Sequence, residues 1–213
     1  MARNRENIIV FDMETTGLDP VENDCIEICA QVVDGMTLSK IPKDDGGVFY
    51  SLMKPQKPEN IEQRALDVNK KTREEIMAAP EAKLVWPQFA NWVSQWKKSY
   101  QPIAAGKNIR GFDLKFVKEL NNRHLKKPKD FSLFNARTII DLEDLLFYWF
   151  EGNDELSGYS MDIVRPYFGL TLEGAHSATI DVEQTTDLII HFMKLHRQQF
   201  KKVKNLKDLS VTR

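Results

Sequence analysis

Residues 8–18 constrain the fold of this chain more than any other segment. Residues 8–11 are apolar, as is typical of a buried strand, and two acids follow, Asp12 and Glu14. Side chains at positions i and i+2 of a strand point to the same face of the sheet. Both carboxylates are therefore expected to project together, where the strand leaves the core and residues 15–17 turn the chain.

Two negative charges side by side repel each other, and burying them without a partner costs free energy. A divalent cation would turn this repulsion into a binding site, because hard cations prefer carboxylate oxygens. The alternative is a solvated strand end that carries two acids by chance. The sequence that flanks the pair, described below, favours the cation site.

Length and composition indicate an ordinary globular protein. At 213 residues, 42% hydrophobic and 29% charged, the chain is expected to form one or at most two domains. The first residues lack the apolar stretch of a signal peptide, and no apolar run approaches the ~20 residues that span a bilayer. We therefore expect a cytoplasmic protein without a membrane partner.

The two cysteines, Cys25 and Cys29, are expected to be core residues. On a strand that rises ~3.3 Å per residue they would lie ~13 Å apart, too far for a disulfide. Their spacing does not match a zinc site.

Charge is distributed unevenly, although the net charge is only −1. Residues 97–129 carry ten Lys or Arg against two acids, and residues 194–213 carry seven against one. Residues 141–155, by contrast, hold six acids and no Lys or Arg. The basic segments are either solvated faces or a positive surface that follows a phosphate backbone.

The order of predicted elements indicates an α/β fold. Three strands come first, and their succession predicts an antiparallel edge on the sheet. Strands then alternate with helices, which predicts a mixed sheet flanked by helices. Trp86, Phe89, Val93 and Trp96 recur at helical spacing and favour core anchors over a base-stacking platform, while Pro87 should open or kink their helix. The predicted strands cover 8–11, 25–33, 48–53, 102–106 and part of 131–140, and the helices cover short segments within 60–77, then 86–96, 111–123, 141–150, 159–168 and 178–200.

Three further residues could complete the acidic site. Asp113 is expected at the start of one helix and Asp181 inside the last one, and each could instead be a capping residue. His176 precedes Asp181 by five residues, so on one continuous helix the two would lie ~140° apart. Their cooperation requires His176 in a loop or first turn, which Gly174 just upstream makes plausible.

Three motifs built on these residues resemble those of a known family. They are residues 11–19 around Asp12 and Glu14, residues 108–116 with Asn108, Phe112 and Asp113, and residues 176–181 from His176 to Asp181. The chain resembles the DEDD superfamily of 3′–5′ exonucleases in its His-containing, DnaQ-like branch (DEDDh). That branch includes the proofreading epsilon subunit of DNA polymerase III, ribonuclease T and oligoribonuclease. One departure is Val182, where the family usually has a small residue, and it puts close helix packing there in question.

The resemblance implies a ribonuclease H-like fold: a five-stranded mixed sheet with one antiparallel strand, flanked by helices. It implies that two divalent cations, Mg²⁺ or Mn²⁺, lie ~3.5–4 Å apart. His176 would accept the proton of the attacking water, since its unperturbed pKa is ~6.5. The metal ligands would be Asp12, Glu14, Asp113 and Asp181, and the substrate-binding residues Thr15, Gly17, Leu18, Asn108 and Phe112. For Phe112, a place in the core is an equal alternative.

The implied function is metal-dependent 3′–5′ hydrolysis of single-stranded DNA or RNA to nucleoside 5′-monophosphates. Two alternatives stay open: an RNA-specific 3′-processing exoribonuclease of the ribonuclease T or oligoribonuclease kind, and a non-catalytic nucleic-acid or polymerase adaptor. The partners implied are single-stranded 3′ ends, with a homodimer or a polymerase partner also open. We assign residues 1–200 to the exonuclease domain and 201–213 to a basic C-terminal tail.

Overall fold

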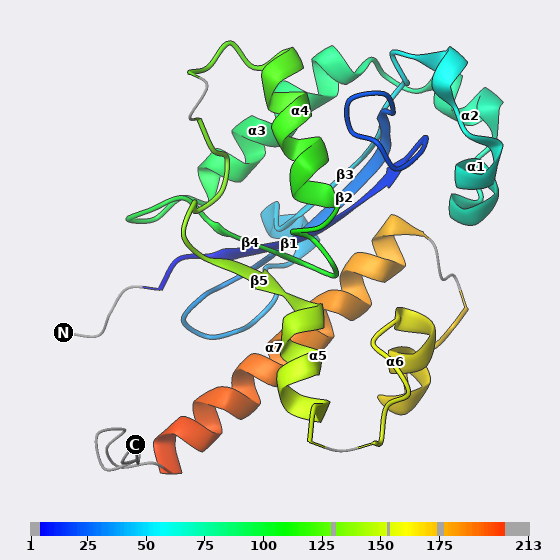
Figure 1. Ribbon diagram of the computed structural model, residues 1–213. Helices are drawn as coiled ribbons and strands as arrows, with labels where there is room; N and C mark the ends of the chain where they lie inside the picture. Colours follow the sequence, from blue (N-terminus) through cyan, green and yellow to red (C-terminus); the bar gives the residue numbers. More distant parts are fainter. Residues whose placement is uncertain (1–4, 129–130, 153, 174–176, 203–213) are drawn as a thin grey trace, which may run out of the picture.

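The computed structural model describes residues 5–128, 131–152, 154–173 and 177–202, which form a mixed five-stranded sheet between two layers of helices (Figure 1). The strand order is β3-β2-β1-β4-β5. β2 is antiparallel to β1 and β3, whereas β4 and β5 continue parallel to β1. The predicted sheet with one antiparallel strand is confirmed. The strands are β1 (Ile8–Thr15), β2 (Cys25–Val33), β3 (Val48–Leu52), β4 (Ile103–Gly106) and β5 (Ile139–Asp141).

Helices α3 and α4 cover one face of the sheet, α5 and α7 pack on the other, and α6 lies beside α7 (Figure 1). The short helices α1 and α2 lie beyond the carboxyl end of β1. Each predicted helix is present, with ends that shift by a few residues. The helices are α1 (Gln63–Asn69), α2 (Arg73–Ala78), α3 (Ala82–Gln95), α4 (Asp113–His124), α5 (Leu142–Phe150), α6 (Met161–Tyr167) and α7 (Ala178–Lys202), with 3-10 turns at Lys43–Asp45 and Pro58–Asn60.

The face of the sheet under α3 and α4 is an aromatic core. Phe11 of β1 stacks on Phe134 at a ring-centroid distance of 5.0 Å and meets the edge of Phe89 at 6.4 Å. Trp86, Phe89 and Val93 are fully buried. The prediction that this aromatic series anchors the core, and does not form a base-stacking platform, is confirmed for these three residues.

The opposite face of β1 begins as an apolar core and ends as an acidic site. Ile8 and Val10 pack with residues of α5 and α7 such as Leu142 and Leu188. Because side chains alternate along a strand, Asp12 and Glu14 continue the row that starts with Ile8 and Val10. The acids therefore lie on the face of β1 that α7 covers.

Two sequence predictions about local structure are corrected. Asp12 and Glu14 lie within β1 and not at its exit, because β2 pairs with the strand from Ile8 to Thr15, with an irregularity at the last step. Of the two roles predicted for Pro87, opening its helix is excluded, since α3 begins at Ala82 and encloses the proline, whereas a kink stays a prediction. Both corrections reflect pairing or packing with distant segments, which outweighs local preference.

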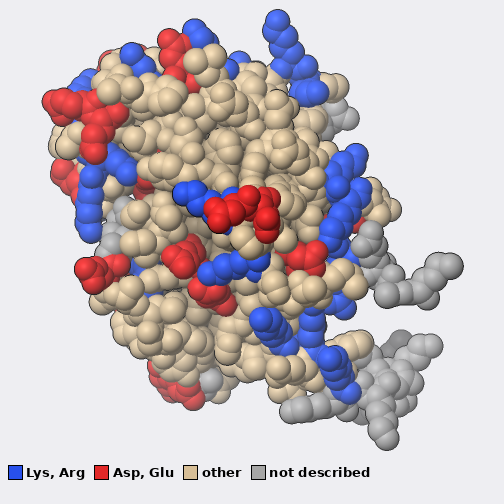
Figure 2. All heavy atoms as spheres, turned by 180° about the vertical axis from the view of Figure 1, so that it is seen from behind, with Lys and Arg blue, Asp and Glu red and all other residues tan. Residues whose placement is uncertain are grey.

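Several basic residues of 97–129 form ion pairs with acids from other parts of the chain. Lys98 forms an ion pair with Asp34 at 3.0 Å, and Lys107 forms one with Glu143 at 2.9 Å. Arg123 bonds to Asp24 at 2.8 Å. On the face turned away from the viewer of Figure 1, basic and acidic side chains are interspersed (Figure 2). Folding thus pairs part of this basic segment with acids from other segments.

Three further predictions concern the cysteines, the C-terminal tail and membrane-spanning helices. Cys25 and Cys29 are free and buried, as predicted. Helix α7 continues through Lys202, past the proposed domain boundary at residue 200, and residues 203–213 of the predicted tail lie outside the described residues. Within the described part of the chain, no helix has the length and apolar character needed to cross a bilayer.

Candidate metal centre

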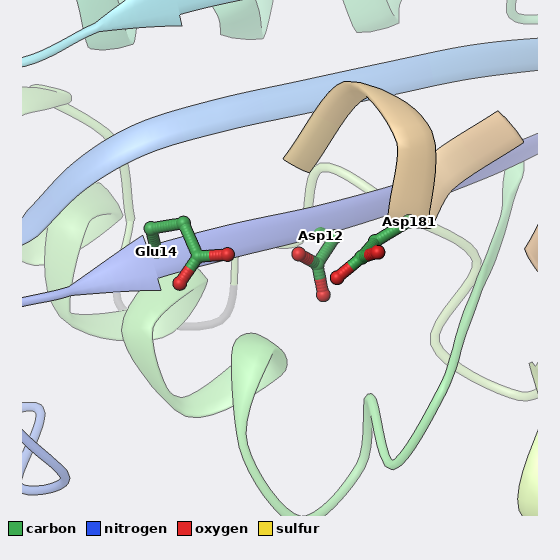
Figure 3. Close-up of side chains that lie close together, drawn as sticks. All are labelled: Asp12, Glu14 and Asp181. Atoms are coloured by element: carbon green, nitrogen blue, oxygen red, sulfur yellow. The ribbon is translucent and has the colours of Figure 1, made fainter. Parts of the chain in front are cut away.

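Three predicted acids converge where β1 passes under the start of α7. Oxygens of Asp12, Glu14 and Asp181 all lie within 4.8 Å of one another, and each residue is partly buried. Figure 3 shows the two strand acids projecting from β1 toward Asp181, which descends from the first turns of α7. Residues almost 170 positions apart in the sequence are thus brought to one point.

Packing at the start of α7 sets the position of Asp181. Ala178 and Val182, one helical turn apart, pack against Cys29 of β2, and all three are buried. Val182 is only 2% exposed, so the valine is accommodated here and α7 still reaches the sheet. Asp181, between these two contacts, is directed toward β1.

The fourth predicted ligand, Asp113, lies beside this group at the start of α4. Its side chain is 2% exposed, and its Oδ1 accepts a hydrogen bond of 3.0 Å from the backbone N–H of Met13. The parallel ladder between β1 and β4 ends at Val10 and Ala105, whereas β2 follows β1 to Thr15. The backbone of β1 is thus open toward α4 at Met13, and Asp113 occupies that opening.

The acids raise one another's pKa values. Burial, followed by the charges of Asp181 and Glu27, raises the pKa of Asp12 to about 7. Burial and the charge of Asp12 raise the pKa of Glu14 to about 8. The pKa of Asp113 is also raised, first by burial and then by Asp12, although the Met13 amide opposes the shift. Burial and mutual repulsion thus favour the protonated forms of these acids when no cation is bound.

Two buried or half-buried cations border the acids, and the sequence analysis did not identify either. Arg165 of α6 is 1% exposed, donates from Nη2 to Oδ1 of Asp181, and lowers the pKa of Asp12. Lys71 lies 3.0 Å from Glu27, which pairs across the sheet with Glu14. Neither residue lies in one of the three motifs. Each comes close to the acids only because its segment packs beside them in the fold.

The donor set fits a hard divalent cation. All three close groups are carboxylates, and Asp113 adds a fourth beside them. Cysteine and histidine ligands, which favour zinc, are not part of the cluster in the described residues. A bound cation stabilises the ionised form of such carboxylates, because it takes the place of the protons and relieves the repulsion between the charges.

A cavity of about 370 Å³ adjoins the acids and is lined by four of the five predicted substrate-binding residues. Glu14 forms part of its wall and so joins the cavity to the carboxylate cluster. Leu18 is 78% exposed at its edge, while Phe112 is half-buried and contacts Phe116 at 5.1 Å between ring centroids. The four residues are Thr15, Gly17, Leu18 and Phe112.

The turn after β1 is tightly held. The hydroxyl of Thr15 donates to the carbonyl of Gly17 at 2.6 Å. A Cβ at position 17 would lie 2.2 Å from Oε1 of Glu62 and 2.5 Å from the Asn23 side chain, so only glycine fits without rearrangement. The cavity wall is therefore set by the backbone of the turn.

Helix α1 supplies cavity residues that the sequence analysis missed, among them Glu62 at its N-cap, Arg64 and Asn69. Asn69 is 3% exposed and donates from Nδ2 to the carbonyl of Thr15 at 3.2 Å. Its Oδ1 has no hydrogen-bond partner in the described structure. No motif in the sequence marks this helix, which was predicted only as a short helical segment.

Two predicted site residues are not brought to the cavity by the described structure. Asn108 is exposed with a φ of 52°, and its backbone N–H donates to Asp141 at 2.8 Å. Its side chain lies against Gly111 of its own loop and not in the cavity wall. His176 lies outside the described residues, so its position beside the acids stays a prediction.

Comparison with known proteins identifies the same region. The RNase T exonuclease family model matches residues 9–189, which include every predicted site residue. PolC-type DNA polymerase III of Thermotoga petrophila is 23% identical over 209 residues, covering 94% of this chain and 13% of the polymerase. The PolC-type enzyme of Pediococcus pentosaceus is 26% identical over 193 residues, covering 87% and 11% of the two chains. This chain therefore spans only about an eighth of the length of these relatives.

Solved structures share the fold. Cell-death related nuclease 4 superposes with a TM-score of 0.72 at 16% identity, covering 90% of this chain and 65% of that one. Exonuclease I of E. coli in complex with a dT13 oligonucleotide superposes with a TM-score of 0.75 at 17% identity, covering 93% and 43%. The ribonuclease H-like architecture predicted from the sequence is thus confirmed.

Proposed function

Because the chain belongs to the RNase T exonuclease family, we propose that it hydrolyses single-stranded nucleic acid from the 3′ end and releases nucleoside 5′-monophosphates. The observation that carries this proposal is the convergence of Asp12, Glu14 and Asp181 within 4.8 Å, at the wall of a cavity. A site that cuts terminal phosphodiesters needs both a cation-binding cluster and a pocket for one nucleotide.

In this proposal the carboxylates of Asp12, Glu14, Asp113 and Asp181 hold two Mg²⁺ or Mn²⁺ ions. When bound, such ions stabilise negative charge on the phosphoryl oxygens and lower the pKa of water. The raised pKa values of Asp12 and Glu14 support this role, because a bound cation relieves the repulsion that raises them.

His176 is proposed to accept the proton of the attacking water at an imidazole nitrogen. A positioned general base is worth about 10²–10⁴-fold in rate. Glu173 before His176 and Ser177 after it lie outside any helix, and α7 begins at Ala178. Cooperation with Asp181 requires His176 to act from a position ahead of this helix.

The terminal nucleoside is proposed to occupy the 370 Å³ cavity. Thr15 and Gly17 provide a backbone wall, and the exposed Leu18 and the half-buried Phe112 provide apolar surfaces for a base. The buried Oδ1 of Asn69 is an unpaired acceptor that a sugar hydroxyl or base amino group could satisfy.

We propose single-stranded DNA as the first substrate to test, with RNA as the alternative. The structural neighbour Exonuclease I was solved with dT13, which supports a DNA strand in this fold. RNA preference depends on contacts to the 2′-hydroxyl, which a direct comparison of substrates measures.

The PolC-type relatives support a polymerase partner, either on the same chain or on a separate one. A polymerase partner, a homodimer and a cytoplasmic location all stay predictions. So does the division into a domain at 1–200 and a tail at 201–213.

The test uses DNA and RNA oligomers of the same sequence, labelled at the 5′ end. Each is incubated with Mg²⁺, with Mn²⁺ and with chelator. We expect a ladder of labelled strands that shortens from the 3′ end and no activity in chelator. The released mononucleotides carry no label and are identified by chromatography. Folded protein that shows no metal-dependent cleavage of either polymer would contradict the proposal and favour the adaptor alternative.

A second test separates the base from the ligands. His176→Ala should lower kcat by about 10²–10⁴-fold and remove the basic group from the pH profile, while Mn²⁺ affinity changes little. Asp181→Asn, by contrast, should weaken Mn²⁺ binding itself. Equal losses of metal affinity in the two variants would show that the assigned roles are wrong.

A further inference from the structure

Arg165 is an unusual residue for the core of this protein. Its side chain is 1% exposed on α6, in a helix whose other buried residue is Val164. A buried guanidinium without partners costs several kcal/mol, so its surroundings must compensate the charge. The groups that do so lead directly to the candidate metal centre.

The guanidinium contacts three side chains on two helices. Nη2 donates to Oδ1 of Asp181, and Nε donates to Oε1 of Gln184 at 2.6 Å. Nη1 lies 3.7 Å from Oδ1 of Asp162, which is 70% exposed and therefore a weak, solvated partner. The two strong contacts are both with α7.

Gln184 fixes the guanidinium in turn. It lies three residues after Asp181, on the same side of α7, and it is 6% exposed. Its Nε2 donates to the carbonyl of Thr171 at 3.0 Å, which leaves Oε1 as the acceptor for Arg165. The hydrogen bonds thus form one continuous chain from Thr171 through Gln184 and Arg165 to Asp181.

This series of hydrogen bonds ends on the one acid of the close group that a helix supplies. Asp12 and Glu14 extend from the middle strand of a sheet, whereas Asp181 lies within the first turns of a helix. Ligating carboxylates depend on hydrogen bonds that hold their orientation, and loss of such a bond typically weakens metal binding by about 10–100-fold.

We propose that Arg165 is a positioning residue that fixes the Asp181 carboxylate, through a two-armed contact with Asp181 and Gln184, in the orientation that a divalent cation shared with Asp12 and Glu14 requires. The proposal rests on the metal-dependent function proposed above. Positioning and charge have opposite effects on metal binding. An arginine that positions Asp181 strengthens it, whereas an arginine that acts only through its positive charge repels the cation and weakens it.

The test measures Mn²⁺ dissociation constants from the electron paramagnetic resonance signal of free Mn²⁺, without substrate. Arg165→Met should raise the dissociation constant about 10–100-fold. Arg165→Lys should lose nearly as much, because one ammonium cannot reproduce the planar fork that reaches both Asp181 and Gln184. Gln184→Leu, which keeps the arginine but removes its anchor, should give an intermediate loss.

Asp162→Asn is the matched control, because it removes the exposed partner of the same guanidinium. It should leave the Mn²⁺ dissociation constant within about twofold of the wild-type value. Circular dichroism and metal-free thermal unfolding identify variants that fail to fold. If Arg165→Met fails to fold, Arg165→Lys and Gln184→Leu decide the question.

Equal Mn²⁺ binding in folded Arg165→Met would overturn the proposal, and tighter binding would overturn it and assign the arginine a repulsive role. Wild-type affinity in both Arg165→Lys and Gln184→Leu would also overturn it. Metal binding would then need neither the planar guanidinium nor its contact with Gln184. Absence of Mn²⁺ binding in the wild-type protein would instead contradict the metal-dependent function itself.

Discussion

The two faces of β1 show how one strand supports both folding and chemistry. On the face toward α3 and α4, Ile9, Phe11 and Met13 are buried in an apolar core along the length of the strand. On the face toward α7, the row changes from Ile8 and Val10 to Asp12 and Glu14. Neighbouring residues such as Phe11 and Asp12 thus have opposite roles, and stability and activity can be tested one residue apart.

Asp12→Asn should have the largest effect on activity. Loss of a central carboxylate should lower metal-dependent kcat/KM by at least about 1,000-fold, or about 4 kcal/mol of activation free energy. The fold should persist, because the uncharged amide removes repulsion from Glu14 and Asp181. Hydrolysis rates and circular dichroism check both parts, and a variant that loses activity only because it unfolds would contradict the separation of the faces.

Phe11→Ala should give the converse result. It removes a ring that is 1% exposed and stacked on Phe134, so the free energy of unfolding should fall by about 3–5 kcal/mol. Denaturant titration measures this loss. Activity per folded molecule should stay close to wild type at low temperature, and a drop comparable to that of Asp12→Asn would show that the two faces are coupled.

The stability of the metal-free protein should depend on pH through the acidic face. Folding raises the pKa of Asp12 to about 7 and that of Glu14 to about 8, so the folded protein retains protons that the unfolded chain releases above about pH 4. The stability that these protonated groups contribute at low pH is therefore lost as the pH rises toward 8.

The measurement compares wild type with Asp12→Asn in chelator at about pH 5 and about pH 8. Between about pH 5 and about pH 8, the free energy of unfolding of the variant should rise relative to that of the wild type by at least about 2 kcal/mol. This follows because one pKa unit corresponds to about 1.4 kcal/mol. Saturating Mn²⁺ should strongly reduce the pH dependence of the wild type. A constant difference between the two proteins would mean that Asp12 is not protonated in the metal-free fold.

Leu18→Ala should have the smallest effect of the four. Its side chain is 78% exposed, so the free energy of unfolding should change by less than about 0.5 kcal/mol. Loss of the apolar contact proposed between Leu18 and a terminal base should raise KM about tenfold. Val21→Ala, 55% exposed but outside the cavity lining, is the matched control and should leave KM unchanged.

The sequence predicted those features that depend on local periodicity. Alternation along residues 8–14 placed Asp12 and Glu14 on one face, and the three motifs identified the family, which the match over residues 9–189 confirms. The strand spanning residues 25–33 was predicted with its observed ends, because the segment is rich in β-branched and small apolar residues.

Apart from the acidic site and the sheet, which the family motifs indicated, contacts between distant segments were not predicted. Arg165 lies 16 residues before its partner Asp181, and Asn69 lies 54 residues after Thr15. Their chemistry is set by how α6 and α1 pack, which no local pattern encodes. The ion pairs within the basic segment, such as Lys107 with Glu143, have the same origin.

The different lengths of β1 and β4 carry a consequence for how this site could be altered. A sheet normally hides the polar backbone of its inner strands, yet here the shorter neighbour leaves a notch that Asp113 enters to bind the Met13 amide. Lengthening β4 by two residues would fill this notch with main chain and displace the carboxylate without touching any acid. The truncation of one strand is thus as much a part of the site as the side chains themselves.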